Sequence, residues 1–181
     1  MKHLFFIVLL LSSLLACNQN KHEQTAQSHI SPLLAQLEKA DSALKSGSFE
    51  QILNLEPEVT DHYSWFQTNY KDTNNRSFWI KQLSDLQYVK RRIDKSRPEL
   101  SKFRESIDFS RSQLNNLQEA YVKKELDSNA FFTYLVDEEN EVSLLSGQLF
   151  AKIEDVRLAT AIWKDLKPQL DSTRAHYSKE F

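Results

Sequence analysis

The five histidines are the residues whose spacing bears most directly on metal chemistry. A carboxylate-bridged di-iron centre in a helical bundle needs Glu-x-x-His on two helices, because residues three apart project from one helix face toward the metal. No histidine in this chain has a glutamate three residues before it, and a single cysteine excludes Cys-x-x-Cys-His haem attachment, zinc ribbons and iron–sulfur sites. We therefore predict no metal and no cofactor. His62 lies among aromatic residues, and we interpret it as a packed, hydrogen-bonded side chain.

The acidic run 137–141 (DEENE) is the one segment whose composition suits acid–base catalysis. Paired carboxylates can hydrolyse bonds when their environments separate their pKa values. This run lies near a predicted helix start, where the helix dipole favours negative charge without any catalytic role. The chain has only two glycines and contains neither a Gly-x-Ser-x-Gly elbow nor EF-hand spacing. We predict that the protein is not an enzyme, and we rank an enzyme whose groups converge only in three dimensions as the weakest alternative.

A basic run is the strongest positive feature of the sequence. Its members share one short segment and are the candidate contact surface: Lys90, Arg91, Arg92 and Lys95. Such a run is suited to an acidic patch on another protein, a polysaccharide or an anionic headgroup, although an ordinary charged helix face is the alternative. The whole chain carries 23 Lys and Arg against 25 Asp and Glu, so its charge balance gives no reason to expect a nucleic-acid partner.

The first seventeen residues have the order of an exported precursor. A short basic start is followed by an apolar run from Leu4 to Ala16, which is shorter than the roughly 20 residues that span a bilayer. The segment Leu14-Leu15-Ala16-Cys17 then resembles the lipobox of bacterial lipoproteins, with a leucine three residues before the cysteine and a small residue directly before it. An uncleaved membrane anchor with an incidental cysteine is the alternative.

The resemblance implies a covalent lipid anchor at Cys17. In that family the thiol receives a diacylglyceryl group, the peptide before the cysteine is removed, and the new amine is acylated. Residues 1–16 would then be a signal peptide, and several acyl chains on one residue would anchor the protein durably. Asn18 follows the cysteine where an aspartate would imply retention at the inner membrane, so the resemblance favours the outer membrane in a two-membrane bacterium.

Residues 17–30 are expected to form the lipidated cysteine and a flexible tether, because they contain almost nothing that could be buried. A single domain is then predicted over residues 31–177. Ser31 and Pro32 would begin a helix that ends at Gly47. A capping box at Ser48 would begin a short second helix to about residue 55, and Pro57 would begin a third. Residues 72–75 are the clearest break inside the domain.

Apolar residues then recur every seventh position in two long segments, which predicts two helices packed on a shared core. The first line is Trp79, Leu86, Ile93, Leu100, Ile107, Leu114 and Tyr121, and the second is Leu135, Val142, Leu149, Val156, Trp163, Leu170 and Tyr177. We predict arms over residues 75–126, bent at Pro98, and 130–177, with the tip near residues 127–129. The aromatic residues need a core wider than one seam, among them Phe103, Phe109, Phe131, Phe132 and Phe150. The predicted fold is all-α, a helical bundle built on a long antiparallel coiled-coil-like hairpin with shorter N-terminal helices.

These observations favour a non-enzymatic, membrane-anchored envelope lipoprotein that acts as a protein-interaction or spacer module. A helical bundle that binds a small ligand in an aromatic-lined core is the alternative. The expected partners are the membrane through Cys17 and an envelope protein or polysaccharide, and a homo-oligomer remains open.

Overall fold

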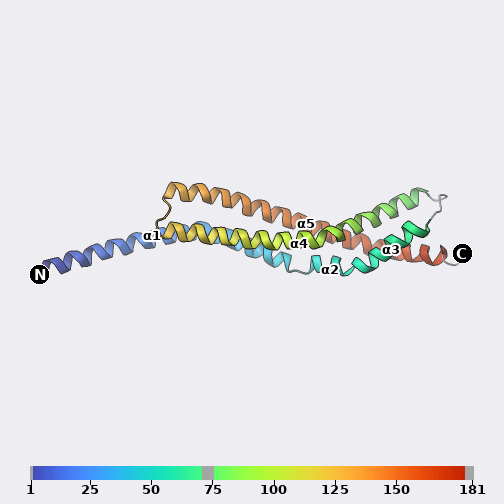
Figure 1. Cartoon of the computed structure of the whole chain (residues 1–181), viewed down its shortest axis with the longest axis horizontal. Helices are drawn as coiled ribbons and strands as arrows, with labels where there is room; N and C mark the ends of the chain where they lie inside the picture. Colours follow the sequence, from blue (N-terminus) through green and yellow to red (C-terminus); the bar gives the residue numbers. More distant parts are fainter. Residues whose placement is uncertain (1, 71–75, 178–181) are drawn as a thin grey trace. The chain divides into compact units, whose positions relative to one another are not determined.

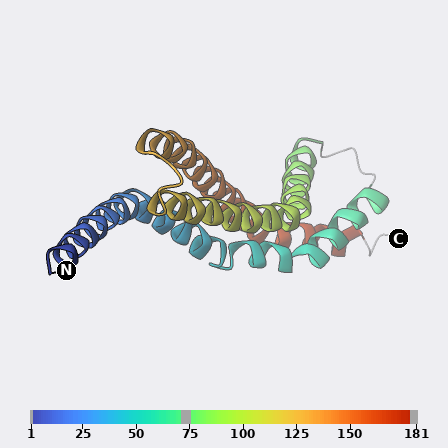
Figure 2. The same cartoon turned by 60° about the vertical axis from the view of Figure 1, so that its left-hand side comes forward.

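The computed structural model describes the backbone of residues 2–70 and 76–177 and the side chains of residues 21–70 and 80–177. It confirms the all-α class and the long antiparallel pair (Figure 1). The elements in chain order are α1 (Lys2–Leu44), α2 (Ser48–Asn54), α3 (Glu56–Asn69), α4 (Arg76–Val122) and α5 (Ser128–Tyr177). Figure 2 shows the two short helices, α2 and α3, in teal, following α1 along the chain. The predicted break at residues 72–75 lies outside the described residues.

The N-terminal part of the helical region begins earlier than the sequence predicts. Residues 21–30 belong to α1, and Ala26 and Ile30 are fully buried, so the prediction of a flexible tether is wrong for this stretch. Pro32 is inside α1, so the predicted helix start at Ser31 is wrong as well. The physical reason is spacing. Few residues here are apolar, but they continue at intervals of three and four with the buried residues that follow, which places them on one helix face: Ala26, Ile30, Leu33, Leu37, Ala40 and Leu44.

Gly47 ends α1 as predicted, with a φ of 85° that a residue with a Cβ adopts only at a cost. The capping box predicted at Ser48 is wrong, because Gly47 occupies the N-cap position of α2 and no side chain caps that helix. Pro57 lies in the first turn of α3, where its missing N–H costs no hydrogen bond. The short helices therefore begin where backbone constraints, rather than side-chain caps, allow them.

The chain divides into two compact units, and each has its own core. The first unit contains residues 1–41 and 105–147, from α1, the second part of α4 and the first part of α5. Its core combines the buried face of α1 with residues of the two long helices, among them Leu114, Leu117, Tyr121, Phe131, Leu135 and Val142. The Tyr121 and Phe131 rings stack with centroids 4.1 Å apart. Burying each large apolar side chain contributes about 1.5–3 kcal/mol, so this three-helix packing stabilises the unit.

The turn between α4 and α5 lies close to the predicted tip. Lys124 has a φ of 62°, in the left-handed region that commonly ends a helix. The Ala130 N–H donates to Asp127 Oδ1 at 2.8 Å, so the aspartate caps the first turn of α5. The tip predicted near residues 127–129 therefore agrees with a turn between Val122 and Ser128.

The second unit contains residues 42–104 and 148–181, of which 42–70, 76–104 and 148–177 are described. Helices α2 and α3 accompany the first part of α4 and the second part of α5. The buried residues include Phe49, Ile52, Val59, Phe66, Leu86, Val89, Ile93, Ile153, Val156, Trp163, Leu166 and Leu170. Polar pairs join α4 to α5: Arg92 Nη1 lies 3.1 Å from Asp155 Oδ2, and Lys152 Nζ lies 3.0 Å from Glu99 Oε1. These partly exposed pairs agree with the antiparallel register of the two helices, which the packing of the buried residues sets.

The seven-residue pattern predicted the core of the long helices well. Every member of the second line from Leu135 to Leu170 is buried, and the first line is buried at each described position except Leu100, which is half-buried. The side chain of Trp79 lies outside those described. Helix α4 continues through Pro98 as a single helix. The aromatic prediction is wrong for three residues that are exposed, with exposed fractions of 65%, 40% and 38%: Phe109, Phe132 and Phe150.

Candidate functional site

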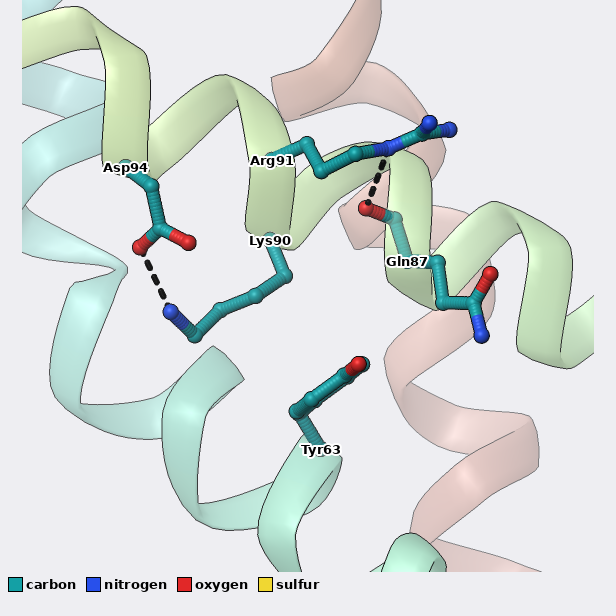
Figure 3. A pocket seen from close by; sticks show the side chains of 5 residues that line it. All are labelled: Tyr63, Gln87, Lys90, Arg91 and Asp94. Atoms are coloured by element: carbon teal, nitrogen blue, oxygen red, sulfur yellow. Dashed lines mark hydrogen bonds and ion pairs between the residues drawn. The ribbon is translucent and has the colours of Figure 1, made fainter.

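A cavity between α3 and α4 of the second unit gathers part of the basic run (Figure 3). Its volume is about 300 Å³, and we call it the α3–α4 pocket. The side chains that line it are Tyr63, Gln87, Lys90, Arg91 and Asp94. Only Tyr63 comes from α3, and the other four come from α4.

The four lining residues of α4 share one helix face because of their spacing. Positions 87, 90, 91 and 94 follow the i, i+3, i+4, i+7 pattern of a single face. Leu86, Val89 and Ile93 are buried on the other side of the helix and hold this face outward. These four side chains line the same cavity, with the Lys90–Asp94 pair at one end and the Arg91 guanidinium extending toward the other end, beside Gln87 (Figure 3).

Tyr63 is positioned by the buried residues that flank it on α3, Val59 and Phe66. Its hydroxyl oxygen accepts a hydrogen bond from Gln67 Nε2 at 2.7 Å, which leaves the hydroxyl proton available for donation. The ring lies beneath the Lys90 side chain in Figure 3, where it gives the pocket a flat apolar wall.

The charges in the α3–α4 pocket leave one positive charge uncompensated. Lys90 Nζ donates to Asp94 Oδ1 at 2.5 Å, and the Lys90 side chain is only 20% exposed. Arg91 Nε donates to the Gln87 backbone carbonyl at 3.3 Å, which holds the guanidinium along α4. Two cations and one carboxylate thus line the site. An anion with a single charge would complete the balance.

The structure separates the four residues of the predicted contact surface. Lys90 and Arg91 line the α3–α4 pocket, whereas Arg92 pairs with Asp155 and lies 5.3 Å from the centre of the Tyr88 ring. Lys95 is exposed and does not line the pocket. Sequence reasoning missed Tyr63, Gln87 and Asp94. The two on α4 could have been found from their spacing to Lys90, but the approach of Tyr63 depends on tertiary packing.

The acidic run remains a solvated helix face. Asp137, Glu139 and Glu141 are exposed, and Glu138 is half-buried. Partial burial raises the pKa of Glu138, and the neighbouring Glu141 and Asp137 raise it further. Among the residues that the structure describes, no group of three or more histidines, cysteines or acids is arranged to hold a metal ion.

His62 is the buried histidine of the second unit, with an exposed fraction of 4%. Its Nε2 lies 3.2 Å from Asp171 Oδ1, and its ring meets the Trp163 ring edge to face at 5.3 Å. Its Nδ1 is buried with no partner among the described residues, so a proton there would lack an acceptor. Burial lowers the pKa of His62, and the nearby Asp171 only partly opposes this effect. The geometry suits a neutral imidazole that donates from Nε2.

This arrangement predicts a loss of stability in mild acid. Because the pKa is lowered on folding, the unfolded chain binds the proton more readily, so His62 reduces stability as pH falls below about 6.5 toward the folded pKa. At pH values above about 6.5, His62 is neutral in both the folded and the unfolded chain, so its titration no longer lowers the free energy of unfolding. We expect urea unfolding at pH 7.5 and 5.0 to show a larger decrease in the wild type than in His62→Gln.

His29→Gln is the matched control because His29 is exposed. The groups that face His62 must stay unchanged in this comparison: Glu58 and Asp61 on α3, and Asp171 and Arg174 on α5. An equal decrease in the wild type and His62→Gln would exclude His62 as the source.

Comparison with known proteins finds no family model that matches the chain, and no curated protein or solved structure that matches it. Within the part of the chain that the structure describes, no helix is both long enough and apolar enough to cross a membrane.

Proposed function

We propose that this chain is a non-enzymatic lipoprotein of the bacterial cell envelope, anchored through Cys17, that serves as a protein-interaction module. The anchor rests on the resemblance of residues 14–17 to a lipobox. The interaction role rests on a group of exposed apolar side chains on α5 in the first unit. Its members are Phe132, Val136 and Leu144, and we call them the α5 apolar face.

These residues cover a broad part of the exposed surface of α5 and do not form a narrow line. Phe132 and Val136 are four positions apart and lie on the same side of the helix, and Leu144, eight positions beyond Val136, is turned about 80° further around it. Their exposed fractions are 40%, 53% and 57%. The core-facing side of the same helix is occupied by Leu135 and Val142, so both sides of this part of α5 carry apolar residues.

A helix that is apolar on two sides is typical of one that packs on two sides. The first unit covers only one of them with its own core. Several exposed apolar residues in one short stretch of helix, rather than single ones scattered over the surface, mark sites of protein association, and aromatic residues contribute strongly to such sites. The surface therefore favours a binding partner over a bare spacer.

In-cell photo-crosslinking tests this proposal. We expect a photo-reactive residue at Val136 to give one discrete adduct with an envelope protein, because this position is exposed at the middle of the α5 apolar face. The same residue at Glu119 is the matched control, because that exposed position lies on a different helix of the first unit, α4. The adduct should disappear in Cys17→Ala, which removes the anchor, and in Leu144→Asp, which places a charge on the face.

Equal adducts at both positions would contradict a specific surface. Adducts only between copies of the chain would replace the adaptor with a self-associating protein. If the acylated protein gives no adduct at either position, the interaction role is wrong.

A further inference from the structure

We propose that the α3–α4 pocket binds a saccharide that carries a single carboxylate, such as a hexuronic acid unit. The inference rests on the second unit alone and does not depend on the α5 apolar face. It assigns a ligand class to the two residues of the basic run that the fold places in a cavity, Lys90 and Arg91.

The carboxylate is assigned to Arg91. Its Nε is held by the Gln87 backbone carbonyl, and among the described residues the two terminal nitrogens of the guanidinium have no partner. These nitrogens form the planar fork that binds a carboxylate through two parallel hydrogen bonds. Because Lys90 is already paired with Asp94, the surplus charge of the pocket lies on Arg91.

The other lining groups suit hydroxyls rather than a second charge. Asp94 uses Oδ1 for Lys90, and its second carboxylate oxygen faces the middle of the group of side chains in Figure 3. That oxygen accepts hydrogen bonds and repels anions, so it favours a ligand with O–H donors. The Gln87 amide both donates and accepts, and the Tyr63 hydroxyl has a proton to donate. A phosphate dianion would meet one surplus cation and a carboxylate, which is a poor match.

The size and shape of the pocket agree with a sugar ring. A volume of about 300 Å³ is at the lower end of small-molecule pockets, so the ligand is one or two rings rather than a long chain. The Tyr63 ring gives a flat apolar wall on which the C–H face of a pyranose can pack. The pocket is open to solvent and has one aromatic wall, so it differs from the aromatic-lined internal cavity considered as an alternative from the sequence.

Calorimetric titration of the full chain in detergent micelles with glucuronic acid tests the proposal. We expect saturable binding with a dissociation constant in the millimolar range, and at least tenfold weaker binding of glucose, which has the same ring without the carboxylate. Arg91→Gln and Tyr63→Ala should each weaken glucuronic acid binding at least tenfold. Arg104→Gln is the matched control, because Arg104 is an exposed arginine of α4 outside the pocket, and it should bind as the wild type does.

Several results would overturn the assignment. Acetate binding as tightly as glucuronic acid would show that only the carboxylate is recognised. Inorganic phosphate binding more tightly would assign a different anion. No binding of glucuronic acid, or the same loss in Arg104→Gln as in Arg91→Gln, would exclude this pocket as a saccharide site. Circular dichroism of each variant would show that the helices are retained, since both Arg91 and Arg104 are exposed.

Discussion

Cys17→Ala is expected to move the protein from the membrane fraction to the soluble fraction and to abolish its labelling with radioactive palmitate. A thioether-linked diacylglycerol and an acylated amine need the cysteine, and alanine provides no thiol. Each buried methylene contributes about 0.8 kcal/mol to membrane binding, so the loss of several acyl chains removes the anchor completely. Fractionation of cells that express the whole chain, with mass spectrometry of the purified protein, measures both effects.

Ser12→Ala is the control for this experiment, because it changes a residue of the apolar run and leaves the cysteine intact. That variant should stay in the membrane fraction and carry the lipid. Mass spectrometry of the wild type should show a chain that begins at Cys17 with added acyl mass. An unmodified chain that begins at Met1 and stays in the membrane would contradict the lipoprotein assignment and favour the uncleaved anchor.

Trp163→Ala is expected to reduce the free energy of unfolding by about 3–5 kcal/mol, the usual cost of truncating a buried aromatic side chain to alanine. Trp163 is 3% exposed, meets His62 edge to face, and donates from Nε1 to Glu58 Oε2 at 3.1 Å. The change leaves a cavity and removes a link from α5 to α3. Urea unfolding followed by circular dichroism measures the effect.

Phe109→Ala is the matched control, because it also truncates an aromatic residue of a long helix but at a position that is 65% exposed. Its effect should stay within about 0.5 kcal/mol. Trp163→Phe separates the effect of volume from that of hydrogen bonding, since phenylalanine fills most of the space and lacks the N–H. This variant should therefore lose less free energy of unfolding than Trp163→Ala. Equal effects of Trp163→Ala and Phe109→Ala would contradict the burial that the structure gives these two residues.

The core of the long helices could be predicted from the sequence because a seven-residue repeat directly describes one side of a helix. Every seventh residue from Leu135 to Leu170 is apolar, and each of these residues is buried. The prediction of a flexible tether before residue 31 was wrong because it relied on the composition of this segment and not on the spacing of its apolar residues. Residues 21–30 have few apolar members, yet Ala26 and Ile30 stand in phase with Leu33, and two residues in phase are enough to extend a buried face.

For the aromatic residues the sequence prediction overestimated burial, whereas for residues 21–30 it underestimated it. Phe131 and Phe132 are neighbours in the chain, so their side chains point in directions about 100° apart on a helix, and when one faces the centre of the core the other lies at its edge or in solvent. The structure buries the first and exposes the second. Aromatic content alone therefore overestimated the width of the core. Because the aromatic residues were assigned to the core, the sequence analysis did not predict the α5 apolar face.

Part of the lining of the α3–α4 pocket could be predicted from the sequence. Charge alone identified Lys90 and Arg91, and helical spacing from them leads to Gln87 and Asp94. Which face of α4 meets α3 depends on how Val59 and Phe66 pack in the core, which residue types alone do not show. Arg92 illustrates the limit of a charge run, because it is adjacent to Arg91 but pairs with Asp155 on α5.

The continuation of α1 through residues 21–30 would change how far the protein reaches from the proposed anchor at Cys17. A flexible segment over residues 18–30 could extend to about 45 Å and let the body sample a wide volume around its anchor. A helix rises only about 1.5 Å per residue, so Ala26, the first buried residue among the side chains that the structure describes, stands roughly 14 Å from Cys17. If Cys17 carries the proposed lipid, the segment between the anchor and the first unit would be short and stiff. A partner of the α5 apolar face would then have to approach the membrane surface, because the number of helical turns after Cys17 would limit how far this part of the chain stands from the lipid.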